Sequence, residues 1–130
     1  MVTYEQYNSL SSLPRRYRKR VAETMFDDEE FIKAIDTKVG RVRSKHNPKL
    51  ILTDSRIIQI DSGMVRSETE DYRLEEITSI QFNRGIRNSL LKLQGPAIDN
   101  EFPVTKRLGQ PFATAAREQM GKNQAQQASE

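Results

Sequence analysis

Pairs of acidic residues are the part of this chain whose spacing could support catalysis or metal binding. Two carboxylates at positions i and i+2 share one face of a strand, where they could bind a divalent cation or act as general acid and base. Three candidate pairs, two of them with this spacing, occur in the chain: Glu68/Glu70, Glu75/Glu76 and Asp99/Glu101. They lie in otherwise polar segments, so we expect solvated surface rather than a catalytic or metal site.

Other reactive residues are scarce. The chain has no cysteine, which excludes disulfides, thiolate metal sites and cysteine catalysis. Its single histidine, His46, precedes Asn47-Pro48, a pattern typical of a turn. There is no glycine-rich phosphate loop and no His-Glu-x-x-His motif. We therefore predict a protein that is not an enzyme, with no catalytic residues, cofactor, metal or small-molecule substrate.

A cationic block near the N-terminus is the strongest candidate for binding. It consists of Arg15, Arg16, Arg18, Lys19 and Arg20. At helical spacing the block lies opposite an apolar stripe that includes Leu13, Tyr17 and Val21. The block could contact an anionic membrane, nucleic-acid phosphates or a protein partner. Alternatively, the stripe packs on the rest of the protein and leaves the cations in water, which is the interpretation we favour.

Length and composition indicate one small domain. The chain has 130 residues and a mass of 15.0 kDa, with 35% hydrophobic and 30% charged residues. Its net charge of +3 is modest for a dedicated nucleic-acid binder. No apolar run approaches the ~20 residues of a membrane span, and the first ten residues lack the pattern of a secretion signal. We expect a cytoplasmic protein, or part of a virus particle assembled in the cytoplasm.

The periodicity of apolar residues predicts helices at both ends of the chain. A first helix is expected over 12–25, with Pro14 in its first turn. A second is expected to begin at Asp27, with Glu30 completing a capping box and Phe26 packing against Phe31. A final helix is expected to begin at Pro111, bury Phe112, Ala115, Ala116 and Met120, and end at Gly121.

The segment between the helices alternates short β-type runs with turn residues. From about 38 to 104 the pattern predicts some seven strands, including a hairpin that turns at Asp54-Ser55 and a polar edge strand near 66–72. We divide the chain into a basic helical extension (1–27), a β domain (28–120) and a disordered tail (121–130).

Three stretches carry a resemblance to a known family. They read LILTDSRIIQID at 50–61, YRLEEITSIQFNRG at 72–85 and GQPFATAARE at 109–118. In these the chain resembles the YokE-like bacterial and archaeal pleckstrin-homology (PH) domain family over about 28–120. The basic helix at 12–25 lies outside the pattern. The resemblance implies a mainly β, α+β fold: a PH-like seven-stranded bent antiparallel barrel, capped by the C-terminal helix, with one or two N-terminal helices.

The resemblance also bears on function. It implies an interaction or assembly module that mediates protein–protein contacts or self-association, and chains of this kind also occur in phages and archaeal viruses. In eukaryotic PH domains the first strand loop often binds inositol phosphates; here Arg41, Arg43 and Lys45 would line one strand face at that position. With the N-terminal block they form the alternative: a peripheral binder of anionic membrane or nucleic acid.

Overall fold

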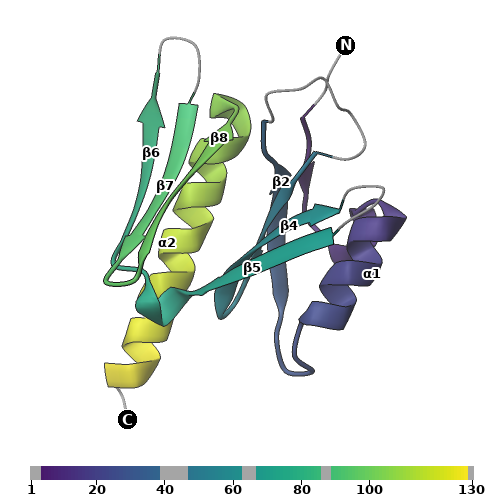
Figure 1. Cartoon of the computed structure of the whole chain (residues 1–130). Coiled ribbons are helices and arrows are strands. Elements are labelled where there is room, and N and C mark those ends of the chain that lie inside the picture. Colours follow the sequence, from purple (N-terminus) through teal and green to yellow (C-terminus); the bar gives the residue numbers. More distant parts are fainter. Residues whose placement is uncertain (1–3, 39–46, 63–66, 86–88, 129–130) are drawn as a thin grey trace.

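The computed structural model describes residues 4–38, 47–62, 67–85 and 89–128 (Figure 1). Two α-helices and eight strands lie in this part of the chain, together with two short 3-10 turns. In chain order these are β1 (Gln6–Tyr7), η1 (Leu10–Ser12), α1 (Arg15–Thr24), β2 (Phe31–Asp36), β3 (Lys49–Thr53), β4 (Arg56–Ser62), β5 (Ser67–Arg73), η2 (Leu74–Glu76), β6 (Ser79–Arg84), β7 (Ser89–Gly95), β8 (Ile98–Val104) and α2 (Lys106–Ala128).

The strands form two antiparallel sheets. Five strands pair in the order β1-β2-β3-β4-β5, and three pair in the order β6-β7-β8. In Figure 1, α1 lies against one face of the larger sheet, while α2 runs between the two sheets. The larger sheet is therefore covered on both faces.

Two hydrophobic clusters occupy these layers. The first joins the inner face of the larger sheet to the smaller sheet and α2, with Ile35, Leu52 and Phe112 among its fully buried members. The second lies between the outer face and α1, where Tyr17 and Val21 pack on Ile58. Because the apolar stripe of α1 is buried here, the predicted helix over 12–25 and its packing on the rest of the protein are confirmed.

The predicted second helix is wrong, because residues 31–36 form strand β2. Ala34 and Ile35 are both fully buried, and they belong to different clusters on opposite faces of the sheet. A continuous apolar run fits a strand covered on both sides as well as it fits one face of a helix. Phe26 belongs to neither hydrophobic cluster and is 63% exposed, whereas Phe31 packs against the second cluster.

The mainly β fold with a C-terminal helix is as expected, but the described residues form eight strands rather than seven, in two sheets that do not close into one barrel. They meet at two corners. The Lys38 amide donates to the Pro103 carbonyl at 2.7 Å, and Tyr72 of β5 packs edge-on against Phe102 of β8. Burial, followed by a hydrogen bond to Glu70, raises the pKa of the Tyr72 hydroxyl to about 12. The strand predicted over about 38–45 lies mostly outside the described residues.

The C-terminal helix is longer than predicted at both ends. It begins at Lys106, where Thr105 accepts the Leu108 and Gly109 amides, so Pro111 lies inside the helix. It continues through Gly121 to Ala128, so the expected end at Gly121 is wrong, and the tail predicted to be disordered over 121–130 is helical as far as Ala128. Residues 129 and 130 lie outside the described residues. Neither helix in the described part of the chain has the length and apolar character needed to cross a bilayer.

The hairpin and the polar edge strand were predicted correctly. Asp54-Ser55 connects β3 to β4, and β5 is the last strand of the larger sheet. The strand pairing aligns Leu52 with Ile57 and Ile58 with Asp71. This register places Arg56 beside the hairpin turn.

The two described glycines of α2 give a matched test of its packing. A Cβ at Gly109 would lie 2.5 Å from a Val104 methyl and 2.7 Å from the Phe82 ring, whereas a Cβ at Gly121 would meet nothing within 4 Å. We predict that Gly109→Ala lowers the free energy of unfolding by about 1–3 kcal/mol through overpacking. Gly121→Ala should raise it by up to about 1 kcal/mol through helix propensity. Urea denaturation followed by circular dichroism measures both, and equal effects would contradict the close approach of α2 to β6.

Candidate functional site

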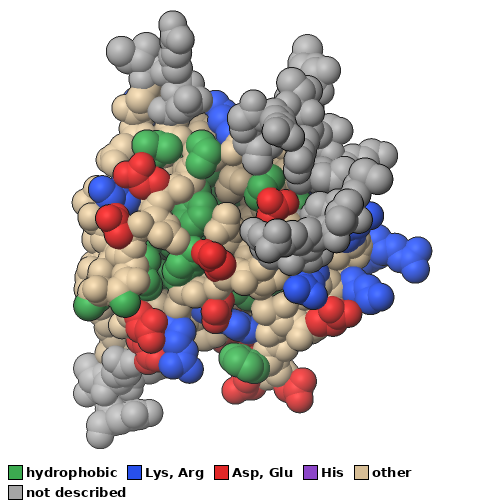
Figure 2. Space-filling model, viewed as in Figure 1, with side chains coloured by type: hydrophobic (Ala, Val, Ile, Leu, Met, Phe, Trp, Pro, Cys, Tyr) green, Lys and Arg blue, Asp and Glu red, His purple; other side chains and the backbone are tan. Residues whose placement is uncertain are grey.

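The cationic block lies on the solvent side of α1. Arg15, Arg18 and Lys19 are exposed, as is Arg16, and Figure 2 shows Lys and Arg side chains gathered over this helix. Arg20 is half-buried and donates to the Thr69 hydroxyl of β5 at 3.3 Å. The second set of predicted anion contacts, namely Arg41, Arg43 and Lys45, lies outside the described residues, as does His46.

Among the side chains that the structure describes, which leave out Glu68, the acidic pairs do not gather into a site. Glu75 contacts Arg73 at 3.4 Å, and Glu101 contacts Lys92 at 3.6 Å. Glu70 accepts a hydrogen bond from the Tyr72 hydroxyl. In the part of the chain that the structure describes, no three acidic or histidine side chains are placed to hold a metal ion.

Two structured clusters of charge remain, and the first is buried. Lys49 is fully buried and donates to Asp36 at 2.6 Å. Its ammonium lies 4.3 Å from the ring centroid of Tyr17 and 5.3 Å from that of Tyr7. Burial lowers the pKa of Lys49, and Asp36 opposes that change. Because this cluster joins β1, α1, β2 and β3 away from solvent, we interpret it as structural.

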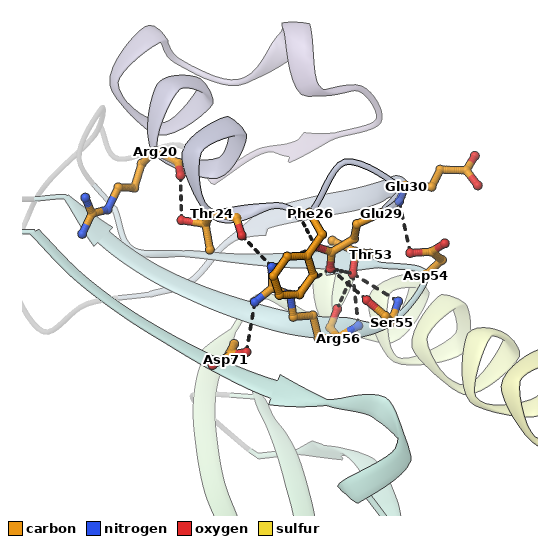
Figure 3. Close-up of polar contacts among 10 residues, drawn as sticks. All are labelled: Arg20, Thr24, Phe26, Glu29, Glu30, Thr53, Asp54, Ser55, Arg56 and Asp71. Atoms are coloured by element: carbon orange, nitrogen blue, oxygen red, sulfur yellow. Dashed lines mark hydrogen bonds and ion pairs between the residues drawn. The ribbon is translucent and has the colours of Figure 1, made fainter.

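The second cluster surrounds Arg56 and reaches the surface (Figure 3). The guanidinium donates from Nε and Nη2 to the two carboxylate oxygens of Glu29, both at 2.8 Å. It also donates to the Asp71 carboxylate at 3.0 Å and to the Thr24 carbonyl, at the C-terminus of α1, at 2.7 Å. A bidentate pair of this kind fixes both side chains in one geometry.

Glu29 receives more donors than this one arginine. Thr53 at the end of β3 and Ser55 in the β3–β4 turn donate hydroxyls at 2.5 Å and 3.0 Å, and the Phe26 amide donates at 3.1 Å. Burial of the Glu29 carboxylate opposes its ionisation. Hydrogen bonds from Arg56, then Thr53, Phe26 and Ser55, outweigh that cost and lower the pKa of Glu29 to about 2.

These bonds fix a tight turn, which we call the Phe26 turn (residues 26–29). The Glu29 amide donates back to the Phe26 carbonyl at 3.1 Å, so the turn is closed in both directions. The Phe26 ring lies over the Arg56 guanidinium, 4.6 Å from its centre, as Figure 3 shows. Asp27 and Asp28 occupy the two central positions and are exposed.

The result is an aromatic side chain presented on an acidic surface. Phe26 is the one large hydrophobic residue that is exposed in the described part of the chain. Figure 2 shows a hydrophobic patch flanked by acidic side chains below the end of α1. A pocket of about 540 Å³ opens beside it, lined by Phe26, Asp28, Glu29, Asp54, Ser55, Arg56, Asp71, Arg73, Glu75 and Asn123.

Comparison with known proteins settles the family. A family model described as a bacterial PH domain matches residues 25–129. The chain belongs to the bacterial PH-domain family. This confirms the resemblance inferred from the sequence, and it places the Phe26 turn and Arg56 within the matched region.

Two solved structures share the fold at low sequence identity. The Vps36 N-terminal PH domain superposes with a TM-score of 0.62 at 17% identity, over 78% of this chain and 86% of that one. A DUF1696 family protein with a PH domain, from Shewanella loihica, gives a TM-score of 0.61 at 15% identity, over 94% of this chain and 97% of that one. No curated protein matches the sequence. PH domains are generally binding modules rather than enzymes.

The Phe26 turn was not predicted from the sequence. The pattern of Phe26, Asp27 and Glu30 indicated the start of a helix instead. The signal that was available is the pair of aspartates between Phe26 and Glu29, because aspartate favours the central positions of turns. The three-residue spacing of Glu29 from the Phe26 amide also reproduces one half of a capping box, here without a helix after it.

The low pKa of Glu29 predicts an acid-sensitive fold. A carboxylate with a lowered pKa stabilises the folded state above its ordinary pKa of 4.5, and this stabilisation is lost as the pH falls through about 2. At pH 7, Glu29→Gln should unfold more easily, because Arg56 loses a buried charged partner. From pH 5 to pH 2.5 the wild type should lose up to about 3 kcal/mol more stability than the variant.

Denaturant titrations at several pH values measure this difference. Glu76→Gln is the matched control, because Glu76 is exposed, and it should follow the wild-type curve. If Glu29→Gln loses as much stability as the wild type when the pH falls from 5 to 2.5, Glu29 is not the source of the acid sensitivity.

Proposed function

We propose that this PH-like domain is a non-enzymatic interaction module, in the cytoplasm or in a particle assembled there, that docks another protein at the Phe26 turn. The observation that carries the proposal is the 63% exposure of Phe26 on a turn held by the buried ion pair of Glu29 with Arg56. An exposed aromatic residue on a rigid support contributes contact area at little cost in conformational entropy. The family supports this in general terms, since PH domains bind proteins or lipids.

The acidic surroundings indicate the chemistry of the docked surface. Asp27, Asp28 and Glu30 lie within four residues of Phe26 in the sequence, and all three are exposed. A complementary surface would combine an apolar recess for the ring with basic side chains at its rim. An anionic membrane does not fit this face, because its charge has the same sign.

Photo-crosslinking tests this proposal. A benzophenone amino acid replacing Phe26 should give ultraviolet-dependent adducts with another protein molecule in the native cell. The same amino acid replacing Gln81, an exposed residue of β6, should give several-fold less adduct. Equal yields at the two positions, or no protein adduct at position 26, would contradict docking at this turn.

A second candidate function is favoured by the exposed cations of α1. Arg15 and Lys19 lie one helical turn apart and have no described ion-pair partner. They could hold the protein on an anionic membrane or nucleic acid, with Arg16, Arg18 and Arg20 nearby. For Arg41, Arg43 and Lys45 this role stays a prediction.

Charge reversal separates this candidate from the first. If α1 binds anionic surfaces, Arg15→Glu/Lys19→Glu should weaken binding to phosphatidylserine vesicles by at least about 30-fold, since each cation near such a surface contributes about 1 kcal/mol. The control is Arg84→Glu/Lys122→Glu, which changes the net charge equally at exposed positions elsewhere. Co-sedimentation measures the effect. Wild-type protein that stays in the supernatant with both vesicles and DNA would reject this candidate.

A further inference from the structure

A second surface of the molecule has the properties that the Phe26 turn requires. It is a groove of about 760 Å³ between β2 and α2, which we call the α2 groove. Its lining residues are Lys33, Lys106, Arg107, Gln110, Pro111, Thr114, Ala115 and Glu118. Most of the lining is apolar, formed by Pro111 and Ala115 and by the aliphatic stems of the long side chains.

The rim of the α2 groove is mainly cationic. Lys33, Lys106 and Arg107 face a single carboxylate, Glu118. Neither Lys33 nor Lys106 has an ion-pair partner among the described residues, while Arg107 donates to the Tyr4 carbonyl at 2.7 Å. An apolar recess with unpaired cations at its edge complements an exposed phenylalanine flanked by aspartates.

The Phe26 turn cannot fill the groove of its own chain, because other contacts fix the position of the turn. Its ring lies on Arg56, and its backbone is held by Glu29. The turn and the groove are therefore separate surfaces on a single rigid molecule. Matching them requires a second molecule.

We propose that the Phe26 turn of one copy of this chain docks in the α2 groove of the next copy, an inference that rests on the proposed function and names its partner. Phe26 enters between Pro111 and Ala115, and Asp27 and Asp28 face Lys33 and Lys106. After one such contact the first copy still has a free groove and the second a free turn, so the contact is head-to-tail and can repeat into an open chain or a closed ring.

The size of the contact determines its strength. One aromatic side chain buries about 150–250 Å², so the docked surface is well below the roughly 1,600 Å² of a standard interface. We therefore expect weak association, with a dissociation constant of up to about 1 mM, which corresponds to a binding free energy of roughly 4 kcal/mol. Because charged rims face each other, added salt weakens the association.

A complementation experiment tests the head-to-tail geometry. Phe26→Ser removes the docking ring, and Lys33→Glu/Lys106→Glu reverses the charge of the groove. By sedimentation velocity each variant alone should be monomeric at concentrations at which the wild type associates. An equimolar mixture should form a one-to-one complex that does not grow further, because it retains a single intact turn and a single intact groove.

Two controls make the result specific. Lys19→Glu/Lys122→Glu changes the net charge equally at exposed positions outside the groove, and it should associate like the wild type. Adding Asp27→Lys/Asp28→Lys to the groove variant restores opposite charges, and it should recover association. A control that loses association as strongly as the groove variant would overturn the proposal.

The remaining outcomes separate this inference from the proposed function. Crosslinking at position 26 between ¹⁵N-labelled and unlabelled copies should give mixed adducts that map to residues 106–118. If position 26 captures a different protein while the chain stays monomeric at 1 mM, the self-docking inference is wrong and the proposed function stands. If position 26 captures no protein, both are wrong.

Discussion

The arrangement of the surface around Phe26 depends on the hydrogen-bond partners of one buried guanidinium. Arg56 is 7% exposed, and its donors reach three separate elements: the last carbonyl of α1, the carboxylate of Glu29 and the carboxylate of Asp71 on β5. Loss of the buried Glu29 carboxylate would leave this charge without its main partner, at a cost of several kcal/mol. The end of the helix, the turn after it and the edge of the sheet are therefore held in one arrangement. The position of Phe26 follows from that arrangement.

The larger sheet explains which elements could be predicted from the sequence and which could not. The β3–β4 hairpin was predictable because Asp54-Ser55 marks its turn locally, and α1 because its apolar stripe has helical spacing. Strand β2 was not, because it is covered by α1 on one face and by α2 on the other. Burial on both faces removes the alternation that identifies a strand, so only the tertiary structure distinguishes it from a helix.

The candidate site was less predictable than the fold for a related reason. Glu29 and Arg56 are separated by 27 residues, and nothing near either residue indicates the other as its partner. The exposure of Phe26 has no local signal either, since a phenylalanine beside a capping motif is normally packed. The exposure of the cationic block of α1, by contrast, could be predicted from the helical spacing of its residues, because charged residues on a helix are normally exposed to solvent.

Both cations buried in the larger sheet also attach the N-terminal segment to the PH domain. The matched family region begins at residue 25, after α1. Lys49, inside that region, lies over the Tyr17 ring of α1, and its charge is balanced by the ion pair with Asp36. Arg56, also inside it, binds the α1 C-terminus, where the helix dipole favours a positive charge. The PH scaffold thus holds the additional helix by charged contacts as well as by burial. Since Arg56 also positions Phe26, attaching α1 and presenting the Phe26 turn are consequences of the same residue.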